Sequence, residues 1–321
     1  MTIAQICILL AIAVYLLAML GVGVWFANKN RSVDDFYLGG RKLGPFVTAM
    51  SAEASDMSSW LLMGLPGVAY LSGLAEASWT AIGLAVGTYL NWLIVARRIR
   101  RYSNHLDAIT VPQFFSKRWG DDRNLLSAIA AVVIIIFFIP YLASGFSACG
   151  KLFASLFGTS YVTAMLISAA VIVIYTVMGG FLAASFTDLI QSIIMTIALC
   201  IIVIFGVVQA GGFDAVIDHA KTLPGFLSFG QTYNEATGQA EPYGLLRIVS
   251  MMAWGLGYFG MPHILVRFMA IRDENELKLS RRIASTWVVI SMAVAVFIGI
   301  VGHAVSSAGR IPFLEGSATE T

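Results

Sequence analysis

Residues 51–60 have the sequence SAEASDMSSW, and this polar stretch lies inside a segment that is otherwise apolar. It contains two carboxylates, Glu53 and Asp56, together with four serines, and the run Gly-Leu-Pro-Gly follows at 64–67. An ionised carboxylate near the centre of a bilayer costs roughly 2.5–3.5 kcal/mol or more, so it needs a partner. Glycine and proline loosen a helix and free its backbone groups. The stretch therefore predicts a transmembrane helix that is broken at a polar site.

The composition indicates that this stretch belongs to an integral membrane protein. Of the 321 residues, 58% are hydrophobic and only 12% are charged, whereas a soluble domain usually has about 25% charged residues. Backbone groups inside a bilayer find no water to bond, so helices are the expected spanning form, and each span needs about 20 mostly apolar residues. The sequence predicts an all-α membrane protein with eight spans, approximately at 5–27, 43–70, 75–96, 124–157, 160–180, 185–209, 244–270 and 283–306.

The basic residues predict how these spans are oriented. Sixteen of the twenty Lys and Arg residues lie in the loops after the first, third and seventh spans or at the span ends beside them. The other four, Lys151, Lys221, Arg247 and Arg310, lie on the opposite side. Because cytoplasmic loops are rich in Lys and Arg, the distribution predicts a multi-pass protein of the cell membrane with both termini outside.

Two of the loops have recognisable local signals. In the internal loop 97–123, Thr110 is expected to cap a short helix that starts near Pro112. The segment 210–243 is the longest external one, and its glycines, proline and polar residues indicate an outer loop with a short helix.

The seventh span is interrupted in the same manner as the second. Residues 251–263 have the sequence MMAWGLGYFGMPH, with three glycines and Pro262. Paired interruptions in the two halves of a chain indicate the site of a secondary transporter, although ordinary proline and glycine kinks are the alternative. Trp254 and Tyr258 lie four residues apart, which predicts one helix face. With Tyr141, which follows Pro140 in the fourth span, they are expected to form a small apolar pocket, unless they are simple packing residues.

Asp56 is the main candidate for a cation contact. The hydroxyl groups of Ser55, Ser58 and Ser59 lie beside it in sequence. Oxygen ligands of this kind suit a hard cation such as Na⁺, and no Lys or Arg lies nearby in sequence to neutralise the carboxylate. The alternative is that Asp56 bonds free backbone amides and stabilises the break, and the two roles can coexist.

Three more charged residues have two interpretations each. Glu53 lies three residues before Asp56, and because two close carboxylates disfavour each other's charge, it is expected to have a structural or tuning role rather than to ligate. Asp188 lies one to two turns inside the sixth span, where it is either a helix-end carboxylate that faces the inner solvent, or a second cation contact or exit-path residue. Arg41 precedes the polar span. It either anchors the cytoplasmic end of the span, as is expected for Lys42, or gates the inner cavity.

Four stretches together resemble the sodium:solute symporter family, and within it the sodium/proline branch. They are FYLGGRKLGP at 36–45, SAEASDMSSWLLMGLPG at 51–67, VIYTVMGGFLAASFTDLIQ at 173–191 and WGLGYFGMPHILVRFMA at 254–270. The resemblance runs in consistent order across almost the whole chain. It implies a leucine-transporter-type fold, in which one transmembrane domain, 1–321, has an extra N-terminal helix at 5–27, a first repeat at 43–209 and a partial, inverted second repeat at 244–306.

The resemblance also implies roles for particular residues. The backbone carbonyls of Ala54 and Met57 would bind Na⁺, and Asp56, Ser58 and Ser59 would support or line that site. Proline would contact Tyr141, Trp254, Tyr258 and Pro262, while Arg41, Ser55 and Asp188 would take part in coupling or gating. Two positions depart from the family pattern: Ser59 stands where glycine is common, and Glu53 where a small residue is common.

The implied function is Na⁺-coupled import of L-proline by alternating access. The expected partners are proline, Na⁺ as the coupling ion and the lipid bilayer, with no enzymatic activity, no other cofactor, no nucleic acid and no required oligomer. Alternatives are a sodium symporter for another small organic solute and a transporter-like input domain of a sensor protein. A channel is disfavoured because the polar residues cluster at mid-membrane, and an intramembrane hydrolase because His263 is a lone candidate base.

The length of the chain carries one more expectation. Members of the family run on for several more spans, one of which normally supplies hydroxyl ligands to Na⁺. The 321 residues are therefore expected to be a C-terminally truncated form, which on its own would not concentrate proline.

Overall fold

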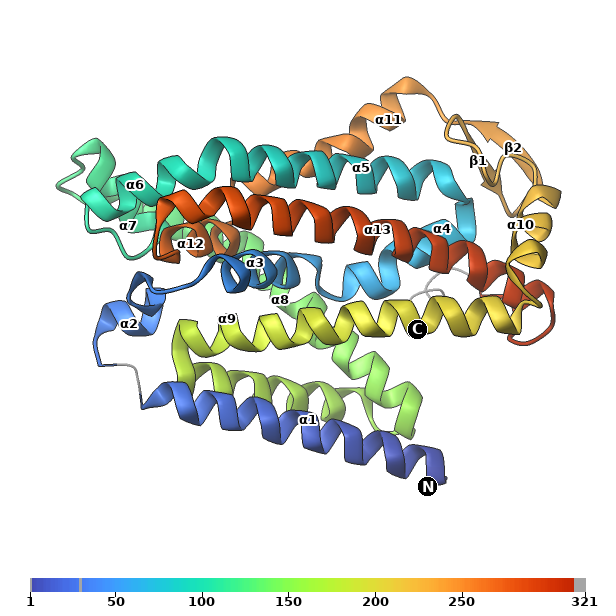
Figure 1. Cartoon of the computed structure of the whole chain (residues 1–321), viewed down its shortest axis with the longest axis horizontal. Helices are drawn as coiled ribbons and strands as arrows, with labels where there is room; N and C mark the ends of the chain where they lie inside the picture. The colour runs from blue at the N-terminus through green and yellow to red at the C-terminus, as the bar shows by residue number, and fades with distance from the viewer. Residues whose placement is uncertain (1, 29–30, 315–321) are drawn as a thin grey trace. The chain divides into compact units, whose positions relative to one another are not determined.

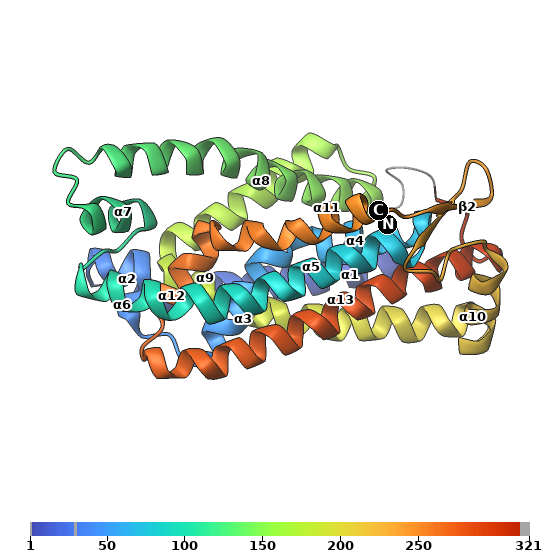
Figure 2. The same ribbon diagram turned by 90° about the horizontal axis from the view of Figure 1, so that it is seen from above.

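The computed structural model describes residues 2–28 and 31–314, and nearly all of this part of the chain is helical (Figures 1 and 2). The elements, in chain order, are α1 (Ile3–Ala27), α2 (Val33–Leu38), η1 (Gly39–Arg41), α3 (Pro45–Ser59), η2 (Trp60–Gly64), α4 (Leu65–Ser72), α5 (Leu74–Asn91), η3 (Trp92–Ala96), α6 (Arg97–His105), α7 (Val111–Trp119), α8 (Leu125–Phe157), α9 (Tyr161–Gln209), α10 (Phe213–Thr222), β1 (Gln231–Asn234), β2 (Gln239–Pro242), α11 (Leu245–Met252), η4 (Ala253–Phe259), α12 (Pro262–Ala270), η5 (Glu274–Glu276) and α13 (Leu277–Ser307). Of the short segments, η1, η4 and η5 are 3₁₀ turns, while η2 and η3 are π-helical.

Every predicted span lies in helical structure, but the helices are divided differently. Among the described residues, five helices are long and apolar enough to cross a membrane, and a sixth is counted if α11–η4 and α12, which meet at 46°, form one span. The second span is absent from that count because its break leaves two short helices, α3 and α4. The fifth and sixth spans are joined in α9.

A single glycine separates the two spans within α9. At about 1.5 Å per residue its 49 residues would extend far beyond the bilayer core of about 30 Å. Gly180 has φ 61° and ψ −156°, which a residue with a side chain rarely adopts. Figure 1 shows the chain turning back on itself at this point. The turn between the predicted fifth and sixth spans is therefore made at Gly180.

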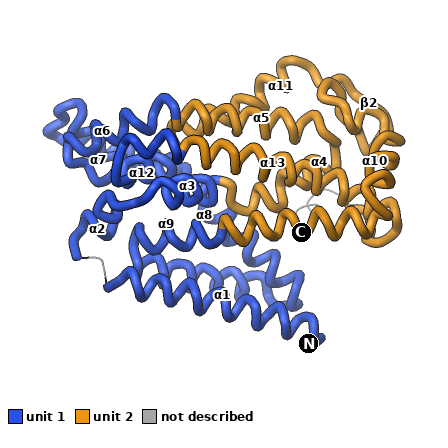
Figure 3. The backbone as a smooth tube through the Cα atoms, in the orientation of Figure 1, with its two compact units in different colours: residues 1–56, 93–191, 261–280 blue, residues 57–92, 192–260, 281–321 orange. Residues whose placement is uncertain are grey.

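The chain divides into two compact units, which are described one at a time (Figure 3). Unit 1 consists of residues 1–56, 93–191 and 261–280, and unit 2 of residues 57–92, 192–260 and 281–321. These boundaries do not follow the predicted repeats, and the assignment of 1–321 to one transporter domain with repeats at 43–209 and 244–306 stays a prediction.

In unit 1, α1 packs on α9 and the start of α3 is fixed to the end of α12. The ring of Phe26 lies 5.5 Å from that of Phe186, and Gln191 donates to the hydroxyl of Tyr15 at 2.7 Å. A short parallel bridge joins Leu43 to Ile271. These contacts hold the polar half of the broken span, α3, against the elements that carry its partners.

In unit 2, α5 lies directly against η4. The Cα of Gly87 and the carbonyl of Gly83 leave no room for a side chain at Gly255, since a Cβ there would lie 2.1 Å from the Gly83 oxygen. One glycine of the seventh span is therefore required by close backbone approach, and not only by a loosened helix.

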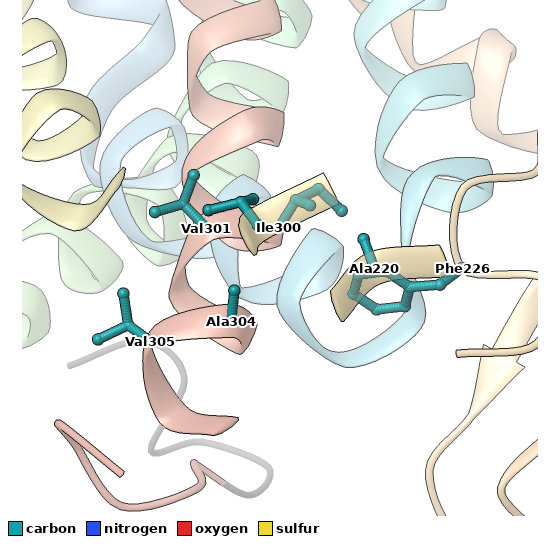
Figure 4. Close-up of a cluster of buried hydrophobic side chains, with 7 residues drawn as sticks. Ala220, Phe226, Ile300, Val301, Ala304 and Val305 are labelled. Atoms are coloured by element: carbon teal, nitrogen blue, oxygen red, sulfur yellow. The ribbon is translucent and has the colours of Figure 1, made fainter. Parts of the chain in front are cut away.

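A separate apolar core of unit 2 lies around α10 and the C-terminal part of α13. Buried side chains of α10, α13 and the connection between them pack together (Figure 4), namely Val216, Ala220, Phe226, Ile300, Val301, Ala304 and Val305. The antiparallel hairpin β1–β2 follows in the same segment. The short helix expected in 210–243 is confirmed as α10, whereas the hairpin was not predicted. The cap of α7 is also confirmed, because the Thr110 hydroxyl accepts from the Gln113 amide at 3.2 Å.

Candidate functional site

The second span breaks at Ser58. This residue has φ 43° and ψ −152° inside α3, and such a conformation costs of order 1–3 kcal/mol for a residue with a side chain. The π-helical η2 follows, in which the Leu65 amide bonds the Trp60 carbonyl. The predicted break is therefore confirmed. It lies within the polar cluster and not at Pro66, which occupies the first turn of α4.

In unit 1, a buried ion pair fixes the polar face of α3. Arg267 of α12 donates to the carboxylate of Asp188 in α9 at 2.6 Å. Its guanidinium also donates to the hydroxyls of Ser51 and Ser55 at 2.5 Å. Both serines donate to Asp188 in turn, at 2.8 and 2.9 Å. Asp188 and Ser55, both predicted coupling residues, are therefore brought together, with Arg267 between them.

Arg267 was counted among the basic residues at the span ends, and the structure gives it a further role as the buried partner of Asp188. Only 8% of its side chain is exposed, and its fourth partner is the carbonyl of His263, at 2.5 Å. A buried guanidinium needs a carboxylate and further acceptors because its desolvation is expensive. The signal in the sequence was its position in the apolar run ILVRFMA, 264–270.

A second group in unit 1 lies around Tyr141. Its hydroxyl donates to the carbonyl of Ser55 at 2.8 Å, which anchors α8 to the last turn of α3. The ring of Tyr141 stacks on that of His263, with centroids 5.7 Å apart and planes at 18°. His263 directly follows Pro262, the first residue of α12, and its Nε2 lies 3.9 Å from a carboxylate oxygen of Asp56. Two predicted site residues, Tyr141 and Asp56, thus share a neighbour that was not assigned to the site.

Arg41 has a clamping position in unit 1. It follows two glycines of positive φ and itself has φ 54°. Its guanidinium donates to the carbonyls of Met269, Ser103 and Ala108 at 2.8–3.1 Å and to the Ser103 hydroxyl at 3.2 Å. Burial lowers the pKa of this guanidinium from its ordinary value, since desolvation disfavours the charged form. The side chain therefore ties η1 to α6, α12 and the loop after α6.

Unit 2 contains the residues on the other side of the break. Met57 is buried, and Ser58 and Ser59 are half-buried. The ring of Trp254 in η4 lies 5.7 Å from that of Trp60 in η2, so an aromatic residue predicted to bind substrate is next to the broken span. In unit 1, Ala54 is buried. Of the predicted sodium-site residues, Ala54 and Asp56 thus belong to unit 1 and the other three to unit 2.

The prediction that Trp254 and Tyr258 share one helix face is wrong. The segment η4 is a 3₁₀ turn, and with three residues per turn a spacing of four no longer falls on one face. Trp254 is 51% exposed, whereas Tyr258 is 2% exposed. A buried amide, Asn91 of α5, donates to the carbonyl of Tyr258 at 2.9 Å and so satisfies a backbone group that the irregular segment leaves unbonded.

The chemistry of these groups favours a small hard cation over a transition metal. Among residues 2–28 and 31–314, no three His, Cys, Asp or Glu side chains come together as a metal cluster. Carbonyls and hydroxyls at a helix break are instead the oxygen donors that suit Na⁺. The individual roles of the predicted site residues stay predictions.

Comparison with known proteins agrees with this chemistry. Residues 36–318 match the sequence model of the Sodium:solute symporter family. The chain is 44% identical over 301 residues to the sodium/proline symporter of Escherichia coli K12 and 42% identical over 305 residues to the osmoregulated proline transporter of Bacillus subtilis 168. Both alignments cover 92% of this chain, which spans 57% and 58% of the length of these relatives. The relatives are transporters and not enzymes.

A solved structure supports the fold. A Na⁺-coupled sialic acid symporter, in a substrate-bound outward-open state, matches with a TM-score of 0.79 and 18% sequence identity. The match covers 99% of this chain and 65% of that one. The predicted all-α, leucine-transporter-type membrane fold is therefore confirmed, and at this identity the match speaks for the fold alone.

Proposed function

The chain belongs to the sodium:solute symporter family, and on that premise we propose that it serves Na⁺-coupled import of L-proline across the cell membrane by alternating access. The observation that carries the proposal is the 44% identity to a sodium/proline symporter over 92% of the chain, a range that includes both interrupted spans. Because the chain spans 57% of that relative's length, the activity is proposed for the protein that carries this sequence.

Na⁺ is proposed to bind at the break in the second span. Ser58 interrupts the helix, so carbonyls before and after it lose their helical partners. The carbonyls of Ala54 and Met57 would bind the ion, and Asp56, Ser58 and Ser59 would support the site with charge and hydroxyl oxygen. Na⁺ is the coupling ion in this scheme, and no other cofactor is required.

Proline is proposed to bind against the aromatic residues beside the break. Its ring is apolar, which suits Tyr141, Trp254, Tyr258 and Pro262. Two observations support the assignment, each within one unit: Tyr141 is held by the Ser55 carbonyl, and Trp254 leaves half of its surface exposed beside Trp60. Tyr258 is almost fully buried and would contribute after a local change.

Coupling is proposed to act through the buried network of Arg267. Asp188 and Ser55 are joined in it, so a change at the last turns of α3 is felt by α9 and α12. Arg41 fixes the neighbouring end of α12 through the Met269 carbonyl. A ligand shifts an equilibrium only by its differential affinity for the two states, and the coupling is reciprocal. Na⁺ should therefore raise the affinity for proline, and proline that for Na⁺.

The orientation is proposed from the charge distribution. Sixteen of the twenty basic residues lie in the loops after the first, third and seventh spans or at the span ends beside them, which supports the proposal that these loops are cytoplasmic and the N-terminus is outside. The protein would work as a multi-pass protein of the lipid bilayer, without nucleic acid and without a required oligomer.

Uptake into vesicles tests the proposal. Vesicles that contain the protein carrying this sequence are given labelled L-proline with an inward Na⁺ gradient, and parallel samples replace Na⁺ by choline. Proline accumulation that needs Na⁺, and that excess sialic acid and other amino acids fail to compete away, is the expected result. Accumulation of another solute in preference to proline would favour a sodium symporter of different specificity, and uptake that persists in choline would contradict Na⁺ coupling.

A further inference from the structure

A basic and aromatic surface of unit 1 lies outside the transport site. It consists of Arg98 and Tyr102 on α6 and Arg118 and Trp119 on α7, and is called the Arg98–Arg118 surface below. The guanidinium carbon of Arg118 lies 4.3 Å from the centroid of the Tyr102 ring and 5.7 Å from that of Trp119. The contact with Tyr102 places α7 beside α6.

The two arginines of this surface keep their charge available. Arg98 lies one helical turn before Tyr102, on the same face of α6, and donates to the Ile94 carbonyl of the preceding η3 at 2.8 Å. Among the described residues, neither Arg98 nor Arg118 has a carboxylate within ion-pair distance. The neighbouring arginines differ, because Arg97 and Arg101 both pair with Glu274.

The aromatic residues place this surface at the level of lipid headgroups. Trp119 is 70% exposed and Tyr102 is 47% exposed, and both residue types are enriched at membrane–water interfaces. Only five residues separate Trp119 from the first residue of α8 that enters an apolar span, Leu125. On the other side, α6 continues directly from η3, whose exposed Leu93 and Ile94 lie at the end of the predicted span 75–96.

We propose that the Arg98–Arg118 surface binds the phosphate group of an anionic phospholipid in the leaflet that faces the basic loops. The guanidinium of Arg118 lies over the Tyr102 ring and that of Arg98 lies further back along α6, beside the Ile94 carbonyl, and both are planar donors that match phosphate oxygens. Basic residues beside transmembrane helices attract anionic headgroups, and the exposed tryptophan ring lies beside the glycerol region. The proposed ligand is any anionic phospholipid, for example phosphatidylglycerol, and it is not a transported solute.

The site has a structural consequence inside unit 1. The helix α6 that carries Arg98 also carries Ser103, whose hydroxyl and carbonyl both accept from Arg41. A lipid that joins α6 to α7 therefore stabilises the helix to which Arg41 is fixed. We expect anionic lipid to raise the thermal stability of the protein through this surface.

Lipid retention measures the proposal directly. The full chain is purified in detergent, supplied with equal amounts of phosphatidylglycerol and phosphatidylcholine, and analysed by native mass spectrometry. The wild type should retain phosphatidylglycerol in preference. Loss of one basic residue near an anionic headgroup should lower that preference about fivefold, so Arg98→Gln and Arg118→Gln should each show this loss and the double variant a larger one. Lys278→Gln removes an exposed cation outside the surface and should retain the wild-type preference.

Several outcomes would overturn the proposal. They are an unchanged phosphatidylglycerol preference in the double variant, an equal loss in Lys278→Gln, or displacement of the lipid by inorganic phosphate alone, which would indicate a site for soluble anions. Melting curves in phosphatidylcholine separate binding from folding. In phosphatidylcholine, the double variant should have the same melting temperature as the wild type. It should lose only the increase in melting temperature that phosphatidylglycerol gives the wild type.

Discussion

Replacement of Asp188 by asparagine is expected to destabilise the protein by about 3–5 kcal/mol. The carboxylate accepts from Arg267, Ser51 and Ser55 at 2.6–2.9 Å, and only 8% of the Arg267 side chain and 16% of the Asp188 side chain are exposed. Asparagine keeps the size of the side chain but removes its charge. The guanidinium then stays buried without a counter-ion, and this uncompensated charge accounts for most of the expected loss.

Thermal unfolding of the detergent-purified protein measures this effect. A change of 1 kcal/mol shifts the melting temperature by about 2–4 °C in domains of 150–250 residues, so Asp188→Asn should melt roughly 6–20 °C below the wild type. Asp122→Asn is the matched control, because it makes the same chemical change at an exposed carboxylate. It should melt within about 2 °C of the wild type, since surface substitutions usually change stability by less than about 0.5 kcal/mol.

A double-mutant cycle separates the ion pair from other causes. In Arg267→Gln the carboxylate loses its partner, and in Arg267→Gln with Asp188→Asn neither charge remains. The double variant should therefore be more stable than the sum of the two single losses predicts, by about 1–3 kcal/mol. The buried-pair account would be refuted if the stability losses of the two single variants simply added in the double variant. It would also be refuted if Asp188→Asn had the same melting temperature as the Asp122→Asn control.

Two further predictions concern unit 2. Gly255→Ala should lower stability by more than about 2 kcal/mol, because its Cβ would lie 2.1 Å from the Gly83 carbonyl oxygen, whereas Gly257→Ala, whose Cβ would have open space, should cost about 1 kcal/mol or less in thermal unfolding. Burial lowers the pKa of His219, whose Nε2 lies 2.9 Å from Nδ1 of His303. The stabilisation that neutral His219 provides is present above its unfolded pKa of about 6.5 and is lost as pH falls through the lowered folded pKa. Amide protection factors in 213–243, which correct for the intrinsic pH dependence of exchange, should therefore fall from pH 7 to pH 5, and His219→Gln should weaken that fall; an equal fall in both proteins would contradict it.

The spans and the break were predictable because their signals are local. Apolar runs of sufficient length define spans by themselves, and a polar cluster inside such a run leaves few alternatives to a break. The location of the break within the cluster, at Ser58, was less predictable, since Gly64 and Pro66 are the stronger helix-breaking residues. The π-helical turn η2 absorbs Gly64, and Pro66 fits the first turn of α4.

The partners of the site residues were not predictable, because they are distant in sequence. Arg267 is 79 residues from Asp188 and 216 residues from Ser51, and the rule that assigns basic residues to the cytoplasmic side treats every arginine alike. His219 and His303 are likewise 84 residues apart in sequence and in contact. The shared face of Trp254 and Tyr258 failed for a different reason, since η4 is a 3₁₀ turn and the α-helical period does not apply.

The dependence of proline uptake on Na⁺ concentration tests the central claim most directly, which is that the break at Ser58 forms the Na⁺ site. Uptake by the protein that carries this sequence is compared between wild type and Asp56→Asn over a range of Na⁺ concentrations. Loss of a charged oxygen contact of about 1.5–3 kcal/mol should raise the Na⁺ concentration for half-maximal uptake by about tenfold or more, with a much smaller effect on the rate at saturating Na⁺. An unchanged Na⁺ dependence in Asp56→Asn would contradict the account.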